Sequence, residues 1–187
     1  MSGDMKPIVY DNFLDNSYNK LINETLFDPQ FAWYYLENIS GDKEVSINNV
    51  SFNKNQSGFN HLVYFDGIQR SNILPLLMPM VHSIEEKFDV SLNNLSRIRI
   101  GMNLNNGESG SHYPHTDMHT PHYTLLYYVD KSDGDTIFYK GPKDNLEVDF
   151  TNPHVQNQAV LFDGLTMHSS SSPVKNSKRT TVNINFS

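Results

Sequence analysis

Two stretches in the second half of the chain alternate between polar and apolar residues, from 97 to 104 and from 179 to 186. Because successive side chains of a β-strand point to opposite faces, this alternation predicts strands with one apolar and one polar face. In the later strand the polar face carries Arg179, Thr181, Asn183 and Asn185. The apolar face must pack on a core, so we expect the polar face to look into an enclosed space.

Other segments predict how that core is built. Apolar residues at three- and four-residue spacing predict amphipathic helices over 11–27 and 71–88. Asp15 is the expected N-cap of the first helix, and Pro75 and Pro79 should lie in the first turns of the second. Segments 123–129 and 159–162 are rich in branched and aromatic residues and predict further strands. The polar stretch 38–60 is expected to form loops and short strands, with a mobile flap as the alternative.

This order of elements predicts an α+β domain whose strands close into a sandwich or barrel. The chain has 187 residues, which suits a single domain over 1–187. Within it, 1–95 would supply the supporting helices and the flap, and 96–187 the strands and the site.

Composition narrows the chemistry. The chain has no cysteine, so disulfides, thiolate metal sites and cysteine nucleophiles are excluded, and a transition metal must use His and carboxylate ligands. Twenty-one acidic residues against 14 basic ones make a nucleic-acid partner unexpected. No apolar stretch approaches the roughly 20 residues that span a bilayer, so we expect a soluble protein with no membrane partner. Composition predicts nothing about the oligomeric state.

A histidine cluster is the strongest chemical signal. His112, His115, His119 and His122 fall close together, and Asp117 follows His115 by two residues. Positions i and i+2 of a strand share a face, so His115 and Asp117 can bind one ion. Two alternatives are a solvated His-rich loop and a zinc site.

The expected third ligand is His168, which ends the strand-like run that begins at Ala159. Two imidazoles and one carboxylate leave coordination positions open, a set that suits Fe(II) oxygen chemistry. Eleven residues later Arg179 begins the alternating strand. A buried arginine requires an anion, and its planar fork matches a carboxylate. Together, His168 and Arg179 predict that a small acid is held between the Arg179 guanidinium and the metal.

From Arg97 to Phe186 the sequence resembles the Fe(II)- and 2-oxoglutarate-dependent oxygenases, in particular the compact prolyl 4-hydroxylase-like branch with bacterial and phage members. The family's His-x-Asp motif corresponds to His115-Thr116-Asp117, and its distal histidine to His168. The resemblance implies a double-stranded β-helix, the distorted, cupin-like jelly roll, supported by N-terminal helices. It implies that His115, Asp117 and His168 are the catalytic metal ligands.

The resemblance also implies a cosubstrate site. Arg179 corresponds to the family's basic residue, with Thr181 two positions on, and Tyr128 to a tyrosine that binds the distal carboxylate. Lys178 makes this register uncertain by one residue, and strand parity favours Arg179. The chain has Asn103 or Leu104 where many relatives carry a tyrosine.

The implied activity is a 2-oxoglutarate-dependent dioxygenase that hydroxylates a proline-like peptidyl residue or a small molecule and releases succinate and CO2. Fe(II), 2-oxoglutarate and O2 are the implied cofactors, with ascorbate a further candidate. Asp117 favours hydroxylation, because related halogenases carry a small residue there. The implied location is the cytoplasm of a bacterium or of a phage-infected host cell.

Alternatives remain open. The same ligands could serve a cupin-like metalloenzyme without 2-oxoglutarate, or the jelly roll could be a non-catalytic binding module. His112, His119 and His122 are expected in loops or at the rim, where one could touch substrate. Arg97 and Arg99 share a strand face. They are either charges at a sheet edge, or Arg99 lies near the pocket and binds an acidic substrate.

Overall fold

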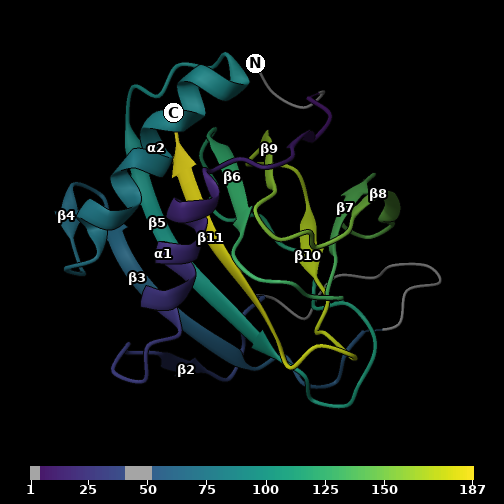
Figure 1. Cartoon of the computed structure of the whole chain (residues 1–187). Coiled ribbons are helices and arrows are strands. Elements are labelled where there is room, and N and C mark those ends of the chain that lie inside the picture. The colour runs from purple at the N-terminus through teal and green to yellow at the C-terminus, as the bar shows by residue number, and fades with distance from the viewer. Residues whose placement is uncertain (1–4, 41–51) are drawn as a thin grey trace.

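The computed structural model describes residues 5–40 and 52–187 (Figure 1). This part of the chain is mostly antiparallel β-sheet with two helices. The elements in chain order are β1 (Ile8–Tyr10), α1 (Asn16–Leu26), β2 (Tyr34–Leu36), β3 (Gly58–Phe65), β4 (Ile68–Gln69), α2 (Leu74–Phe88), β5 (Leu95–Leu104), β6 (Tyr123–Tyr128), β7 (Thr136–Lys140), β8 (Glu147–Asn152), β9 (Ala159–Asp163), β10 (His168–Ser170) and β11 (Lys178–Phe186).

Two sheets contain these strands. The larger has eight strands in the order β1-β9-β6-β11-β5-β3-β2, with β4 paired to β3, and the smaller has the order β10-β7-β8. The central strand β11 pairs with β5 on one side and β6 on the other, with Asn183 opposite Arg99 and Thr181 opposite Tyr128. Figure 1 shows α1 crossing one face of the larger sheet, with the smaller sheet on the other side of the molecule.

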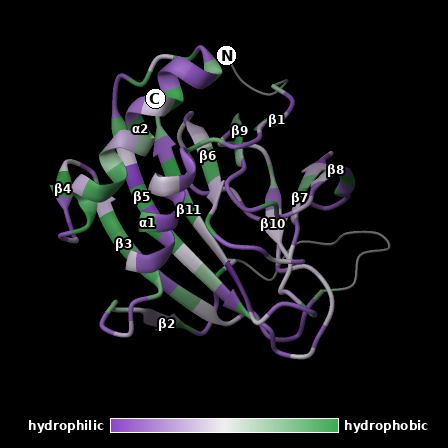
Figure 2. Ribbon diagram, viewed as in Figure 1, coloured by the Kyte–Doolittle hydropathy of each residue, from purple (hydrophilic) through white to green (hydrophobic). Residues whose placement is uncertain are grey.

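The main core lies between the helices and the larger sheet (Figure 2). Fully buried side chains from α1, α2 and β11 meet there, among them Ile22, Leu77 and Ile184. The expected two faces of β11 are confirmed, because Val182, Ile184 and Phe186 belong to this core whereas Arg179, Thr181 and Asn183 line a cavity. The apolar periodicity of one strand therefore directs its polar face toward the site.

The first half of the chain contains more sheet than predicted. β3 is an eight-residue strand that pairs with β5, yet it begins inside the stretch expected to form loops and short strands. Its polar residues Asn60 and His61 obscure the apolar period. Residues 41–51 of the proposed flap lie outside the described residues.

The two predicted helices are present with shifted starts. α1 begins directly after Asp15, whose side chain makes no capping hydrogen bond. α2 begins at Leu74 with proline in its first turn, but Pro79 lies inside the helix, contrary to prediction. Proline has no N–H, so Pro79 cannot donate a helical hydrogen bond, and packing of Met80 and Val81 in the core stabilises the helix around it.

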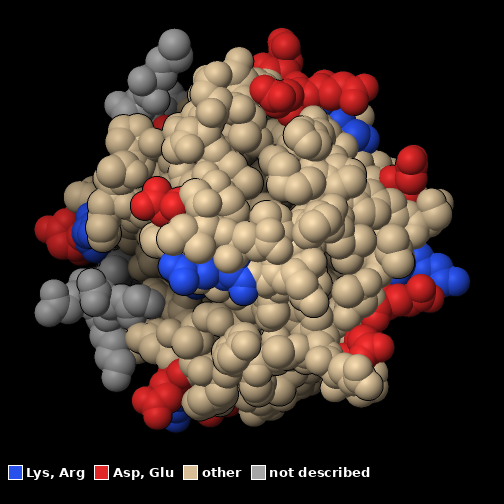
Figure 3. Space-filling model, turned by 90° about the vertical axis from the view of Figure 1, so that its left-hand side faces the viewer, with Lys and Arg blue, Asp and Glu red and all other residues tan. Residues whose placement is uncertain are grey.

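Charged side chains are dispersed over the face shown in Figure 3, where Lys and Arg form small groups rather than a continuous basic surface. No helix among the described residues is both long and apolar enough to cross a bilayer.

Truncating the central strand should destabilise the fold. Ile184 is fully buried in the main core, so Ile184→Ala removes apolar contacts and leaves a cavity. We expect the free energy of unfolding to fall by about 2–5 kcal/mol, measured by urea denaturation. Val174→Ala is the control, because Val174 is 46% exposed and its truncation should change stability by less than about 0.5 kcal/mol. Equal losses in both variants would contradict the role of Ile184.

Candidate active site

The structure brings His115, Asp117 and His168 together. One potential ligand atom from each lies within 4.8 Å of the others. His115 lies in the segment between β5 and β6, where it forms an isolated antiparallel bridge with His168 at the start of β10. The two backbones exchange hydrogen bonds of 2.9 and 3.0 Å, and the imidazole centroids are 4.8 Å apart. A short backbone pairing thus joins two candidate ligands that lie more than fifty residues apart in the sequence.

Four side chains from the larger sheet hold the Asp117 carboxylate. Arg97 Nη2 donates to Oδ1 at 2.7 Å, in a salt bridge whose aspartate side chain is 2% exposed. Oδ2 accepts hydrogen bonds from Asn183 Nδ2 at 2.8 Å, Asn185 Nδ2 at 3.1 Å and Thr124 Oγ1 at 3.3 Å. Strands β5, β6 and β11 therefore orient one carboxylate toward the two imidazoles.

The protonation states suit a divalent metal. Burial raises the pKa of Asp117, but interactions with His168 and Arg97 outweigh it and hold this pKa well below its usual range. Burial, followed by His168, lowers the pKa of His115 to about 4. Burial also lowers the pKa of His168. At neutral pH the site therefore offers an ionised carboxylate and two neutral imidazoles, the forms that bind metal.

Backbone carbonyls orient both imidazoles. His115 Nδ1 lies 3.2 Å from the Tyr113 carbonyl oxygen, and His168 Nδ1 lies 3.0 Å from that of Thr166. A carbonyl can only accept, so each Nδ1 carries the proton and each Nε2 is left with a free lone pair. The donor set, its burial and its charges all fit one metal ion.

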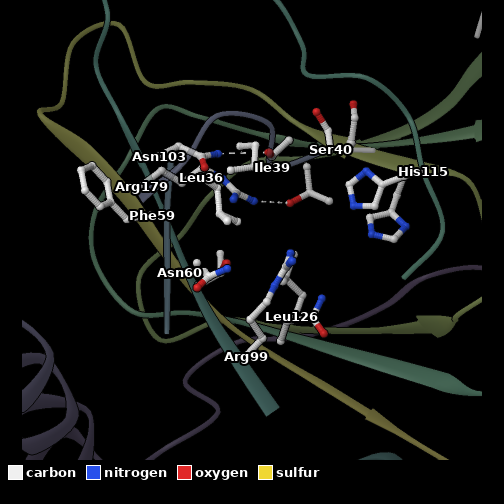
Figure 4. A pocket seen from close by; sticks show the side chains of 17 residues that line it. Leu36, Ile39, Ser40, Phe59, Asn60, Arg99, Asn103, His115, Leu126 and Arg179 are labelled. Atoms are coloured by element: carbon white, nitrogen blue, oxygen red, sulfur yellow. Dashed lines mark hydrogen bonds between the residues drawn. The ribbon is translucent and has the colours of Figure 1, made fainter. Parts of the chain in front are cut away.

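A cavity adjoins these imidazoles, and Arg179 reaches into it from the start of β11 (Figure 4). Arg179 Nε donates to the Gly134 carbonyl oxygen at 2.9 Å, and Nη2 to Thr136 Oγ1 at 2.7 Å. A Cβ at Gly134 would lie 2.8 Å from Arg179 Cδ and 2.5 Å from the Ser171 carbonyl oxygen, so only glycine permits this approach. Among the described residues no carboxylate forms a salt bridge with Arg179, which suits a carboxylate ligand.

The other predicted cosubstrate residues lie around Arg179. Thr181 lines the cavity, whereas Lys178 points to the opposite face of β11, with Nζ 3.9 Å from the centroid of the Phe27 ring. Tyr128 does not line the cavity. Its buried hydroxyl donates to Thr136 Oγ1 at 2.8 Å, so it supports the residue that Arg179 also contacts.

Sequence reasoning missed the residues that hold Asp117. It placed Arg97 and Arg99 on one face but left open that they were sheet-edge charges, and this reading is wrong because β3 and β11 flank β5. Arg97 binds Asp117 and Arg99 lines the cavity. The parity of the alternating strand already placed Asn183 and Asn185 on the polar face, and this signal could have identified them.

The remaining histidines of the cluster are outside the ligand group. His112 is buried rather than at a rim, and its ring nitrogens lie 2.9 Å from Ser170 Oγ and 3.1 Å from Ser172 Oγ. His122 is buried too, with Nδ1 2.7 Å from the Thr120 carbonyl oxygen, and His119 is exposed. Hydrogen bonds to two serines hold both ring nitrogens of His112, whereas His122 is held through Nδ1 alone.

Removing the cation behind Asp117 should weaken metal binding. Arg97→Met keeps much of the side-chain length but deletes the salt bridge, so the carboxylate loses both orientation and charge compensation. We expect the affinity for Mn(II), measured by calorimetry, to fall about 10–100-fold. Arg70→Met, which removes an exposed guanidinium, is the matched control and should bind Mn(II) like the wild type. Unchanged affinity in folded Arg97→Met would contradict this role.

Comparisons with solved structures show which proteins share this fold. A 2OG-Fe(II) oxygenase family oxidoreductase from Burkholderia pseudomallei superposes with a TM-score of 0.67 at 12% identity, covering 97% of this chain and 84% of that one. A prolyl hydroxylase from Trichoplax adhaerens, in complex with a peptide fragment of hypoxia inducible factor, gives 0.61 at 14% identity, covering 96% and 82%. A non-heme alpha ketoglutarate dependent epimerase from nogalamycin biosynthesis gives 0.58 at 11%, covering 96% and 77%. The sequence matches no family model and no curated protein.

The chain thus has the fold of the 2OG-Fe(II) oxygenases over almost its whole length.

Proposed function

We propose that this protein is an Fe(II)- and 2-oxoglutarate-dependent dioxygenase that hydroxylates a small molecule or a peptidyl residue and releases succinate and CO2. The observation that carries the proposal is the placement of His115, Asp117 and His168 beside the same cavity as Arg179. A metal site and a carboxylate site in one cavity suit a cosubstrate with a carboxylate at each end. In this proposal the two sheets form the double-stranded β-helix of that family.

Each part of the site has a role in the proposal. His115, Asp117 and His168 would hold Fe(II), which supplies O2 activation when bound. Arg179 would bind the distal carboxylate of 2-oxoglutarate, and Thr181, two residues further along β11, also lines the cavity. Tyr128 would support Arg179 rather than contact the cosubstrate, because its hydroxyl donates to Thr136 and its ring centroid lies 5.7 Å from Arg179 Cζ.

Apolar side chains complete the cavity. Leu126 lies in its wall, and Leu36, Ile39 and Phe59 line it from β2, the segment that follows β2, and β3 (Figure 4). Such residues exclude water from the reacting groups, which strengthens the charged contacts with the cosubstrate. Hydroxylation rather than epimerisation is the part of the proposal that rests on the resemblance to the prolyl hydroxylase-like branch.

The test begins without oxygen. Fe(II) and then 2-oxoglutarate are added to the anaerobic protein, and a weak metal-to-ligand charge-transfer absorption is expected in the wild type but not in His168→Ala. Oxygen should then produce succinate, with the slow turnover that occurs without substrate subtracted. Folded protein that binds Fe(II) but not 2-oxoglutarate would show a metalloenzyme of another kind. Protein that binds no divalent metal would favour a non-catalytic module.

A further inference from the structure

A second arginine, Arg99, points into the same cavity. It lies in the middle of β5, and Figure 4 shows its side chain entering the cavity from a different side than Arg179. Its Nε is buried and has no hydrogen-bond partner among the described residues. No carboxylate within residues 5–40 and 52–187 forms a salt bridge with its guanidinium.

Among the described residues, no carboxylate pairs directly with Arg99. Among the described residues lining the cavity, the only other charged group is Arg179, also a cation. The nearby Asp117 carboxylate forms its salt bridge with Arg97 rather than with Arg99, and it belongs to the candidate metal-ligand group. A partly buried guanidinium stays charged and is unfavourable without an anion, so this side of the cavity suits a ligand that carries a carboxylate.

An unpaired acceptor lies beside this unpaired donor. Asn183 stands opposite Arg99 on the neighbouring strand, so the two side chains share a face of the sheet. Its Nδ2 donates to Asp117, which determines the orientation of the amide, and its Oδ1 is buried without a partner. The pair thus offers a cation for a carboxylate and an oxygen for an N–H group.

We propose that Arg99 and Asn183 bind the primary substrate, Arg99 through its carboxylate and Asn183 through an adjacent amino group. The substrate class is then a free α-amino acid rather than a residue within a peptide, whose α-carboxyl group is an uncharged amide. The inference rests on the proposed function, because it assigns Arg179 to 2-oxoglutarate and leaves Arg99 for the second ligand.

The test uses the full chain loaded with Mn(II) and 2-oxoglutarate, which binds ligands without turnover. The twenty L-α-amino acids and their α-carboxamides are compared by calorimetry. At least one acid should bind about 30-fold or more tightly than its amide, since the amide leaves Arg99 unpaired. No preference for any acid over its amide in the wild-type protein would overturn the proposal, as would equal binding of a blocked peptide containing the same residue.

Three variants test whether Arg99 binds the substrate or the cosubstrate. Arg99→Gln should lose affinity for the preferred acid about 30-fold or more, while its affinities for Mn(II) and 2-oxoglutarate stay within about threefold of wild type. Arg99→Lys, which keeps the charge, should retain part of the binding, and Arg70→Gln should behave as wild type. If Arg99→Gln instead loses 2-oxoglutarate, Arg99 belongs to the cosubstrate site and the inference is wrong. If the wild type binds no 2-oxoglutarate, the proposed function itself fails, and this is measured before any amino acid is added.

Discussion

Replacing His168 by alanine should lower the affinity for Mn(II) by more than about 100-fold and abolish 2-oxoglutarate turnover. His168 is one of the three clustered candidate ligands, and its Nε2 lies 3.9 Å from Asp117 Oδ2. Without its imidazole, only His115 and Asp117 of the candidate ligand group remain. Loss of a ligand should exceed the 10–100-fold effect of losing a group that only orients one. Calorimetry with Mn(II) measures the affinity, and succinate formation measures turnover.

The matched control for His168→Ala is His119→Ala. His119 belongs to the same histidine-rich segment as His115 but is exposed and outside the ligand group. We expect His119→Ala to bind Mn(II) like the wild type. Circular dichroism and thermal melting establish that His168→Ala is folded, because its ring also packs against Phe162. A folded His168→Ala protein with wild-type affinity would exclude His168 as a ligand.

Arg179→Gln should weaken 2-oxoglutarate binding about 100-fold while leaving Mn(II) affinity within about threefold. Truncating a charged partner of a buried carboxylate costs about 2–5 kcal/mol, and 100-fold corresponds to about 2.7 kcal/mol. The metal ligands are untouched, because the Arg179 guanidinium contacts Gly134 and Thr136 instead. Calorimetry of 2-oxoglutarate into Mn(II)-loaded protein, beside a Mn(II) titration of each variant, separates the two affinities.

Lys178→Gln tests the register of the strand. Lys178 is the adjacent cation in sequence, but it packs over Phe27 on the other face of β11. The Lys178→Gln protein should therefore bind 2-oxoglutarate with wild-type affinity. Loss of binding in Lys178→Gln and not in Arg179→Gln would reverse the assignment. Wild-type affinity for 2-oxoglutarate in both Lys178→Gln and Arg179→Gln would mean that the distal carboxylate binds elsewhere.

The local sequence pattern predicted the strands that have one polar and one apolar face. β5 and β11 alternate between polar and apolar residues, and both helices carry apolar residues at helical spacing. β3 was missed because the polar residues Asn60 and His61 interrupt its apolar pattern, and because it pairs with β5, which is distant in the sequence. Such pairing leaves little trace in the local sequence.

The sequence by itself determined which face of each alternating strand carries the polar groups, because the two-residue period of a strand is a local property. It therefore placed Arg97 and Arg99 on one face, and Arg179 and Asn183 on another. Only the tertiary structure decided that β5 lies between β3 and β11, that Arg97 binds Asp117, and that Arg99 Nε lies buried with no hydrogen-bond partner among the described residues. The reason is that strand order depends on contacts between distant segments, and these contacts decide which charges are neutralised within the protein and which require a ligand.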